Sequence, residues 1–414
     1  MKVSFLSSKF LFFFHYFLVN YLSLFGMQIS KLIQKLRVST LSPFPRYNFS
    51  SQIPQDYDLV FEKKHQYGQA GTLHTNLQYN KIKIHLKTIW EDYALLKLYS
   101  QSKDLGNKLS FREEENNCYL EDTEPSQDQK EAYLLAEIPE YYSLDIKNRD
   151  SVGFVKGDVS SKLFGNANLE LTDPGNEFQA SKIKSEYFDV KINKGAFKIS
   201  SFLESAQFNL NCHEGNLDIK RLGLSGTGEF QVEKGTLNIG SLYCGYHFAQ
   251  KGEDAEARSI NISNDMKSIE EMINDLRERI KQTQHTKIVG QDINVNITHL
   301  QGNTIIESEA GNYNLPNLES ELLVLKLTKG EIKLTLSKLR SEGIIYLKDG
   351  TLNLGIDPNT RINIYLSKEQ RFIGKGFESG LPILVVHIEN GKLNLEEAKK
   401  RDIFAELKQK YNKQ

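Results

Sequence analysis

Acidic side chains that recur at a fixed interval are the first candidates for chemistry in this chain. Asp189 and Glu229 lie 40 residues apart, with Asn209 midway between them. If each 20-residue interval is one rung of a stack, the two carboxylates lie roughly 10 Å apart on an outward row. That spacing is at the far edge for a pair in which one acid protonates a leaving group and the other activates water. Asp218, beside Lys198 in the same register, is more simply half of a cross-rung ion pair.

Amides occupy several neighbouring outward positions. They predict a hydrogen-bonded ladder of the kind that stacked strands tolerate: Asn209, Asn211, Asn238 and Asn353. We therefore assign no catalytic residue.

Residues of zinc-binding type form the second candidate set: Cys212, His213, Cys244 and His247. Cys212 and His213 are neighbours on an expected strand, so their side chains face opposite sides and fourfold coordination would need distortion. The acids at residues 101–130 lack a fixed calcium-ligand spacing. The GLSGTG segment at residues 223–228 fits neither G-x-S-x-G nor the phosphate-loop spacing, and it predicts a loop between rungs. The sequence therefore predicts no metal, no cofactor and no nucleotide.

The charge and cysteine content limit the partners and the compartment. Lys plus Arg number 52 and Asp plus Glu number 53, a formal net charge of -1. Without a global basic field, the chain is not expected to bind nucleic acid. Three cysteines, Cys118, Cys212 and Cys244, leave at least one unpaired, which argues against a disulfide framework and favours a reducing compartment.

A sixfold repeat supplies the scaffold for these side chains. In each copy an apolar residue precedes two polar ones, a glycine and an alternating apolar tail, as in INKGAFKI, VEKGTLNI and LKDGTLNL. Intervals of 20, 20, 95, 20 and 41 residues separate the glycines: Gly195, Gly215, Gly235, Gly330, Gly350 and Gly391. The interval of 41 is close to two periods, and EAGNYNL, ending at Leu315, predicts a seventh, degenerate copy.

Each copy predicts a strand, a glycine turn and a second strand. Apolar residues two apart place alternate side chains on one face, and glycine takes positive φ without steric cost. One copy cannot close a core, but the next copy in a stack covers its apolar row. The predicted fold class is therefore all-β, a β-solenoid or β-helix-like stack of roughly twenty-residue repeats. A meander of antiparallel hairpins is the alternative, because a glycine turn between alternating runs also predicts a hairpin.

These patterns divide the chain into six segments. We expect a targeting leader (1–50), an N-terminal β region with an acidic, solvated loop (51–135), a first β-repeat block (136–250), a helical insertion (251–287), a second β-repeat block (288–395) and a C-terminal helix (396–414).

Two of these segments are predicted helices. In the insertion, apolar residues step by 3, 4, 3 and 4 positions, the spacing of a helix seam: Met266, Ile269, Ile273, Leu276 and Ile280. We expect this helix to pack on the flank of the stack, with a partner helix as the alternative contact. The C-terminal helix, with apolar Ala398, Ile403, Phe404, Leu407 and Tyr411, is expected to cap the last rung.

The amino-terminal segment has the composition of a targeting signal. No acidic residue precedes Asp56. Residues 27–52 are basic, contain serine and lack acid, as organellar transit peptides do, so Met27 is a candidate start and mitochondria are the expected location. Residues 10–25 form an apolar run behind Lys2 and Lys9, which resembles a signal peptide or a marginal membrane anchor. Membrane contact is expected only through residues 10–25.

The repeat motifs also carry a family resemblance. The copies with GNLDI, GTLNI and GTLNL, preceded by EIPEYYSLDIKNRDSVGFVKGDV, resemble the putative-adhesin domain of bacterial surface proteins. They are also similar to the eukaryotic proteins called family with sequence similarity 185 member A, which share this β-strand-repeat domain. The resemblance covers about residues 136–366 and implies a β-helix-like fold, no established enzymatic activity and, for the eukaryotic members, a mitochondrial setting. It supplies no functional site, and the helical insertion and acidic loop depart from its pattern.

Together these observations predict a non-catalytic, adhesin-like β-repeat scaffold or interaction protein inside mitochondria. Its partner is an unknown protein or glycan ligand. A secreted or membrane-anchored adhesin-like binding module is the first alternative. A degenerate carbohydrate-active β-helix enzyme is the second.

Overall fold

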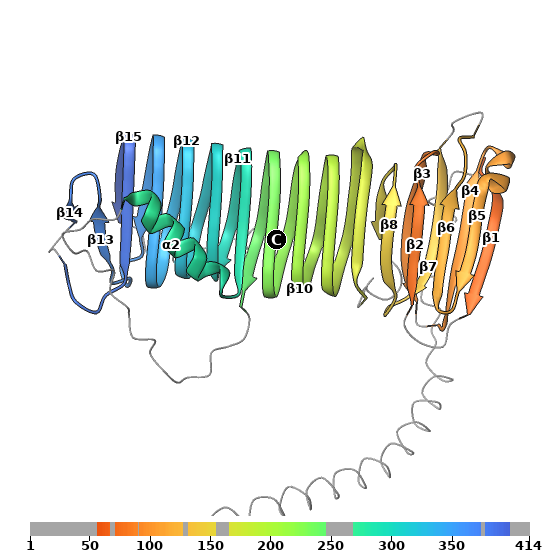
Figure 1. Ribbon diagram of the computed structural model, residues 1–414, viewed down its shortest axis with the longest axis horizontal. Helices are drawn as coiled ribbons and strands as arrows, with labels where there is room; N and C mark the ends of the chain where they lie inside the picture. The colour runs from red at the N-terminus through yellow and green to blue at the C-terminus, as the bar shows by residue number, and fades with distance from the viewer. Residues whose placement is uncertain are drawn as a thin grey trace, which may run out of the picture. The chain divides into compact units, whose positions relative to one another are not determined.

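The computed structural model describes residues 56–66, 71–89, 91–126, 131–154, 165–245, 268–373 and 377–397. Its strands belong to one 15-stranded sheet, which confirms the all-β class. Four long strands make up the central array: β10 (Ala167–Cys244), β11 (His285–Gln301), β12 (Asn303–Ile356) and β15 (Ile383–Glu397). In Figure 1, β10 and β12 each cover several neighbouring rungs that follow one another side by side.

The central array pairs in parallel. Glu229 of β10 pairs with Lys287 of β11, and Lys287 pairs with Ile305 of β12. Farther along, Gly350 of β12 pairs with Gly391 of β15. Hairpins would join these segments in antiparallel fashion. The alternative of an antiparallel meander is therefore wrong for the central array.

The repeat glycines lie directly over one another. A Cβ atom added to Gly235 would lie 1.9 Å from the carbonyl oxygen of Gly215, and one added to Gly330 would lie 1.8 Å from that of Gly311. Gly235 and Gly330 also have positive φ angles of 136° and 142°. These two positions therefore need glycine for two reasons, the backbone conformation and the close approach of the preceding rung. At Gly195, Gly215 and Gly391, where φ is not positive, only the close approach applies.

This glycine column contains more positions than the six repeat glycines. Gly311, in the predicted seventh copy, has a φ of 128° and pairs with Ile293. Ile293 also pairs with Gly235, so QDINVNI is a further copy in which a buried isoleucine stands at the glycine position. Asn176 lies over Gly195 in the same way. A pattern built on glycine missed Ile293 and Asn176.

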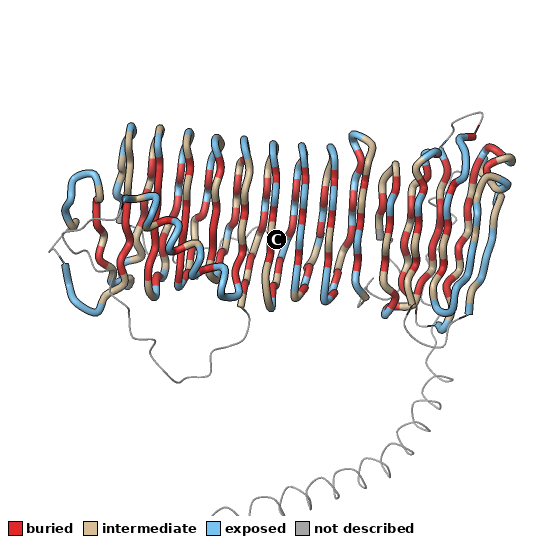
Figure 2. Tube along the Cα trace, in the orientation of Figure 1, coloured by how far each residue is buried: buried red, intermediate tan, exposed pale blue. Residues whose placement is uncertain are grey.

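Apolar side chains from successive rungs fill the interior. Figure 2 shows buried and exposed positions alternating along each rung of β10. Five buried phenylalanines stack there with ring centroids 5.1 to 6.1 Å apart: Phe178, Phe188, Phe197, Phe208 and Phe230. Each buried ring contributes about 1.5–3 kcal/mol. The stack of rings therefore joins the rungs that the glycine column aligns.

Shorter strands continue the sheet on the N-terminal side of β10: β1 (Asp58–Gln66), β2 (Thr72–Leu77), β3 (Ile82–Ile89), β4 (Tyr93–Ser100), β5 (Leu109–Glu114), β6 (Asn117–Asp122), β7 (Ala132–Pro139), β8 (Ser143–Asn148) and β9 (Val152–Phe154). Strands β2, β3, β8 and β9 pair in parallel with their neighbours. Strands β1, β4 and β5 pair antiparallel, so the parallel order of the central array gives way to hairpin-like pairing at this end.

The expected solvated loop at residues 101–130 is wrong over the described part, residues 101–126. That stretch holds a 3₁₀ helix, η2 (Lys103–Lys108), and the β5–β6 hairpin. Cys118 and Leu120 are fully buried in the hairpin. The Asp122 carboxylate accepts the backbone N–H groups of residues 78–80 at 2.7 to 2.8 Å. At least one acid of this stretch is therefore a structural cap and not a solvated charge.

Helix α2 (Ile269–Lys281) forms where the helix seam predicts it. A capping box at its start joins Ser268 and Glu271. The apolar face of α2 packs on outward-facing apolar residues of the sheet, which confirms the predicted flank contact: Ile273, Leu276 and Ile280 against Ile305, Val324, Ile344 and Val385. Three ion pairs tie the helix to β12, namely Arg277 with Glu307, Arg279 with Glu342, and Lys326 with Glu270.

The C-terminal part departs from the sequence expectation in two ways. Gly350 and Gly391 are direct partners, so the 41-residue interval does not hold an intervening copy in the column. Instead, residues between them form β13 (Asn363–Leu366) and β14 (Arg371–Phe372), and β13 pairs with the first half of β15. The predicted helix at 396–414 begins inside β15, which runs to Glu397, and the rest of that prediction lies outside the described residues.

Replacing Gly330 by alanine tests the glycine column. The added Cβ would clash with the Gly311 carbonyl and would also adopt an unfavourable φ, so we expect a loss of about 3 kcal/mol or more in the free energy of unfolding. Gly380→Ala is the matched control, because Gly380 has a φ of 83° but no atom within 4 Å of the added Cβ. Urea denaturation measures both changes, and equal losses would contradict the close-approach argument.

Candidate binding groove

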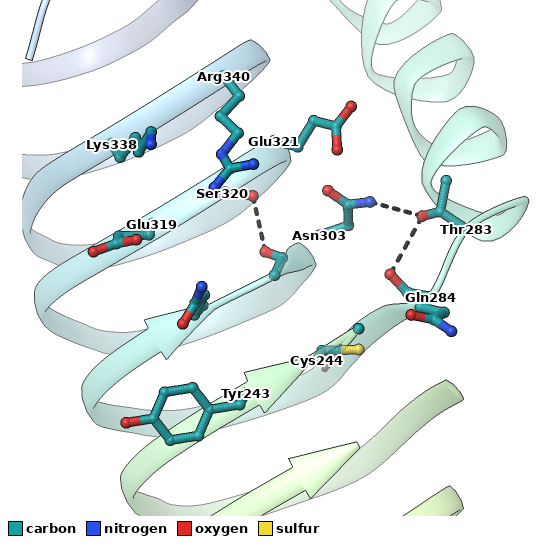
Figure 3. Close-up of a pocket in the computed structure, with 13 residues that line it drawn as sticks. Tyr243, Cys244, Thr283, Gln284, Asn303, Glu319, Ser320, Glu321, Lys338 and Arg340 are labelled. Atoms are coloured by element: carbon teal, nitrogen blue, oxygen red, sulfur yellow. Dashed lines mark hydrogen bonds between the residues drawn. The ribbon is translucent and has the colours of Figure 1, made fainter. Parts of the chain in front are cut away.

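A polar groove runs beside the C-terminal end of α2, across the bends of several consecutive rungs (Figure 3). Its volume is about 730 Å³. The lining comes from the end of β10, from Thr283 and Gln284 after α2, from residues 301–303, and from two later bends of β12 at residues 319–321 and 338–340. We call it the corner groove.

Strand register brings these separate segments together. Tyr243 pairs with Gln301, and Gln301 pairs with Glu319. At the bend between β11 and β12, Gly302 has a φ of 126°, and a Cβ there would lie 2.6 Å from the Cys244 carbonyl oxygen. The side chains of successive bends therefore project into the groove at intervals of one strand spacing, about 4.8 Å.

Hydrogen bonds hold the floor of the corner groove in place. The Asn303 side chain donates to Thr283 Oγ1 at 2.9 Å and accepts the backbone N–H of Leu322 at 3.0 Å. Ser320 Oγ lies 2.9 Å from the carbonyl oxygen of Gly302, to which it donates. Each bond joins two different segments of the wall. The groove is thus built before any ligand binds, which lowers the entropy cost of binding.

Four charged side chains line the corner groove: Glu319, Glu321, Lys338 and Arg340. Within the part of the chain that the structure describes, none of the four forms an ion pair. The two carboxylates come from one bend and the two cations from the next, so acceptors and donors lie side by side. Together with the amides of Gln284 and Gln301, these side chains can both donate and accept hydrogen bonds, and the lining carries no net charge.

The one thiol of the groove is unsuited to nucleophilic chemistry. Burial raises the pKa of Cys244 to about 11, and its Sγ donates to the Gly226 carbonyl oxygen at 3.4 Å. A thiol with so high a pKa is almost entirely protonated at neutral pH, and the thiolate is the reactive form. Cys244 therefore serves as part of the wall.

The acids singled out in the sequence lie on the outward face of β10, away from the corner-groove lining. Asn209 Nδ2 donates to Asp189 Oδ1 at 2.6 Å, and Glu229 pairs in register with Lys287. Within residues 165–245, no ion pair joins Lys198 to Asp218, so that expectation is wrong. An ion pair forms instead beside a glycine turn, from Lys194 to Glu214 at 2.7 Å, and on the next rung His213 Nδ1 lies 2.6 Å from Glu233 Oε2.

The predicted asparagine ladder forms only in part, as separate pairs. Asn296 donates to Asn238 at 3.0 Å, and Asn394 donates to Asn353 at 2.7 Å. On a second row, Asn312 donates to Asn294 at 2.9 Å. Asn209 donates to Asp189 instead of to another asparagine. These exposed amides satisfy one another across rungs.

The zinc-type residues do not converge. Cys212 is buried and His213 is exposed, as their opposite orientations on a strand predict, while His247 lies outside the described residues. Burial raises the pKa of Cys212 to about 11. Among the described residues there is no group of three or more metal-ligating side chains. The GLSGTG segment, expected as a loop, is continuous with β10.

Sequence reasoning missed the corner groove. Its residues come from bends, where the alternation of apolar and polar residues along the strands is interrupted. The helical insertion also separates Tyr243 from Gln301 by 58 positions in the sequence. Gly302 is the one local signal, since a glycine between two predicted strands marks a bend. Only the strand register of β11 and β12 shows that Gly302 lies beside residues 319–321.

No protein-family model matches the chain, and no curated protein matches it. Among solved structures, a putative adhesin from Parabacteroides merdae is 11% identical, with a TM-score of 0.31, 82% of this chain covered and 96% of that chain covered. A putative adhesin from Parabacteroides distasonis gives the same values. A putative lipid-binding protein from Parabacteroides distasonis is 8% identical, with a TM-score of 0.25, 81% of this chain covered and 96% of that chain covered.

Among the helices in the described part of the chain, none is long and apolar enough to span a membrane.

Proposed function

We propose that this chain is a non-catalytic binding module, built as a β-solenoid, that holds a hydroxyl-rich ligand such as a glycan in the corner groove. The four charged side chains without ion-pair partners in that groove carry the proposal. Parallel pairing, the glycine column and the stacked phenylalanines support the solenoid architecture. A stack of this kind supplies rigid bends from which binding side chains project.

The chemistry of the lining favours a neutral, polar ligand. Glu319 and Glu321 are acceptors, Lys338 and Arg340 are donors, and the amides offer both. A sugar hydroxyl both donates and accepts, so a run of hydroxyls can satisfy all of these groups at once. A highly charged ligand would instead meet two side chains of its own sign. The phenol ring of Tyr243 adds an apolar surface with a polar end at the edge of the groove.

The alternative of a carbohydrate-active enzyme has weaker support. Catalysis would need two carboxylates facing one bound sugar. Asp189, Asp218 and Glu229 lie on the outward rows of β10 and not in the corner groove. An enzyme would have to use Glu319 and Glu321, and the depolymerisation assay below tests this alternative. A protein ligand is the second binding hypothesis, because asparagine pairs on the outward rows offer a polar face.

We further propose a mitochondrial location and kinship with the eukaryotic adhesin-like repeat proteins. Both rest on the sequence, the first on the acid-free segment at residues 27–52 and the second on the repeat motifs. Secretion or membrane anchoring through residues 10–25 is the alternative.

Glycan binding is tested with a glycan array, followed by calorimetry of the strongest binder. We expect Glu321→Gln and Arg340→Gln each to weaken binding about tenfold, because each removes a charge-assisted hydrogen bond worth about 1.4 kcal/mol or more. Glu229→Gln is the matched control and should bind like the unaltered protein. An array without binders, or equal affinities in all variants, would contradict the proposal, as would depolymerisation of a polysaccharide by the unaltered protein.

The location is tested by amino-terminal sequencing of the mature protein from its native cells. A first residue between positions 47 and 51 is expected, because import removes a transit peptide. A first residue near Gly26 would instead support secretion.

A further inference from the structure

The last rung of the array is only half covered. The second half of β15, from Gly391 to Glu397, pairs with β12 on one side. On its other side, β13 reaches only residues 383–386 of β15. Within the described residues, the strand segment 391–397 therefore has one open edge.

The core is open at the same place. Leu352 and Leu354 of the preceding rung are fully buried, and they pair in register with Leu393 and Leu395. Leu393 is only partly buried, and Leu395 is 47% exposed. An inward-facing row of the core thus ends in exposed leucine beside unpaired backbone groups. Such an edge is a template for association unless something covers it.

We propose that residues 398–414 of the same chain cover this open end and bury Leu393 and Leu395. The segment carries an apolar face with helical spacing at Ile403, Phe404, Leu407 and Tyr411. Helix α2 shows that this sheet accepts an amphipathic helix through its apolar face. With residues 398–402 turning the chain back, a helix over residues 403–414 would be about 18 Å long, enough to cover most of the roughly 23 Å of a seven-residue strand.

Connectivity favours this occupant over a second copy of the chain. The segment begins at Ala398, immediately after the exposed edge. A short tether gives an effective concentration in the millimolar range, which a separate molecule does not reach at ordinary protein concentrations. The proposal does not depend on what the corner groove binds.

A photoreactive residue tests which molecule covers the end. In the full-length chain, p-benzoylphenylalanine in place of Leu395 should crosslink to residues 398–414 within one monomer, as peptide mass spectrometry would show. The same group in place of Asn353, an outward position on the preceding rung, should give no such crosslink. A crosslinked dimer would identify a second copy as the occupant and overturn the proposal. Absence of any crosslink from position 395 would show an uncovered end and would also overturn it.

Hydrogen exchange gives a second test that leaves the β array untouched. With Phe404→Ser and Leu407→Ser combined, the amides of residues 391–397 should exchange at least tenfold faster than in the unaltered chain. Asp402→Ser combined with Gln409→Ser alters the side of the segment opposite its apolar face and should leave exchange unchanged. Unchanged exchange in the first variant would overturn the proposal.

Discussion

Contact between backbones at the glycine column is the constraint on which the rest of the structure depends. At Gly195, Gly235, Gly330 and Gly350, a Cβ atom would lie 1.8 to 1.9 Å from a carbonyl oxygen of the preceding rung. A slip of one residue would put a side chain into that contact and would also turn each apolar row outward. The glycines therefore fix the register as well as the turn, and register decides which side chains become neighbours.

Register produces outward rows whose chemistry changes along the array. One row begins with polar residues and becomes apolar after Lys287: Asp189, Asn209, Glu229, Lys287, Ile305, Val324, Ile344 and Val385. Helix α2 lies on the apolar part of this row, where burial of its own apolar face offsets the conformational entropy lost when the helix forms. The helix in turn places Thr283 and Gln284 at the wall of the corner groove. The groove thus follows from the same register that stacks the core.

The parts of this structure that depend on short-range residue patterns could be predicted from the sequence. Glycine at the turn and apolar residues two apart predicted the repeat, and a 3,4 apolar spacing predicted α2. Sequence reasoning failed where the cause is distant. Ile293 stands at the glycine position between Gly235 and Gly311, and only the strand register reveals it. The β5–β6 hairpin was hidden because acids and amides outnumber its buried Cys118 and Leu120. The corner groove brings together bends that are not evenly spaced in the sequence, because the helical insertion lies between the first bend and the others.

Distances between spin labels on one outward row test the stacking of rungs most directly. With the three buried cysteines replaced by alanine, one label at Lys198 is combined with a second at Asn296, Asn314 or Lys333. Stacked rungs place these positions three, four and five strand spacings away, about 14, 19 and 24 Å. Double electron–electron resonance should therefore give distances that rise by about 4.8 Å for each rung. The helical insertion lies in the sequence between Lys198 and all three partner positions, but it should not interrupt this series. Distances that do not rise in equal steps would contradict the account.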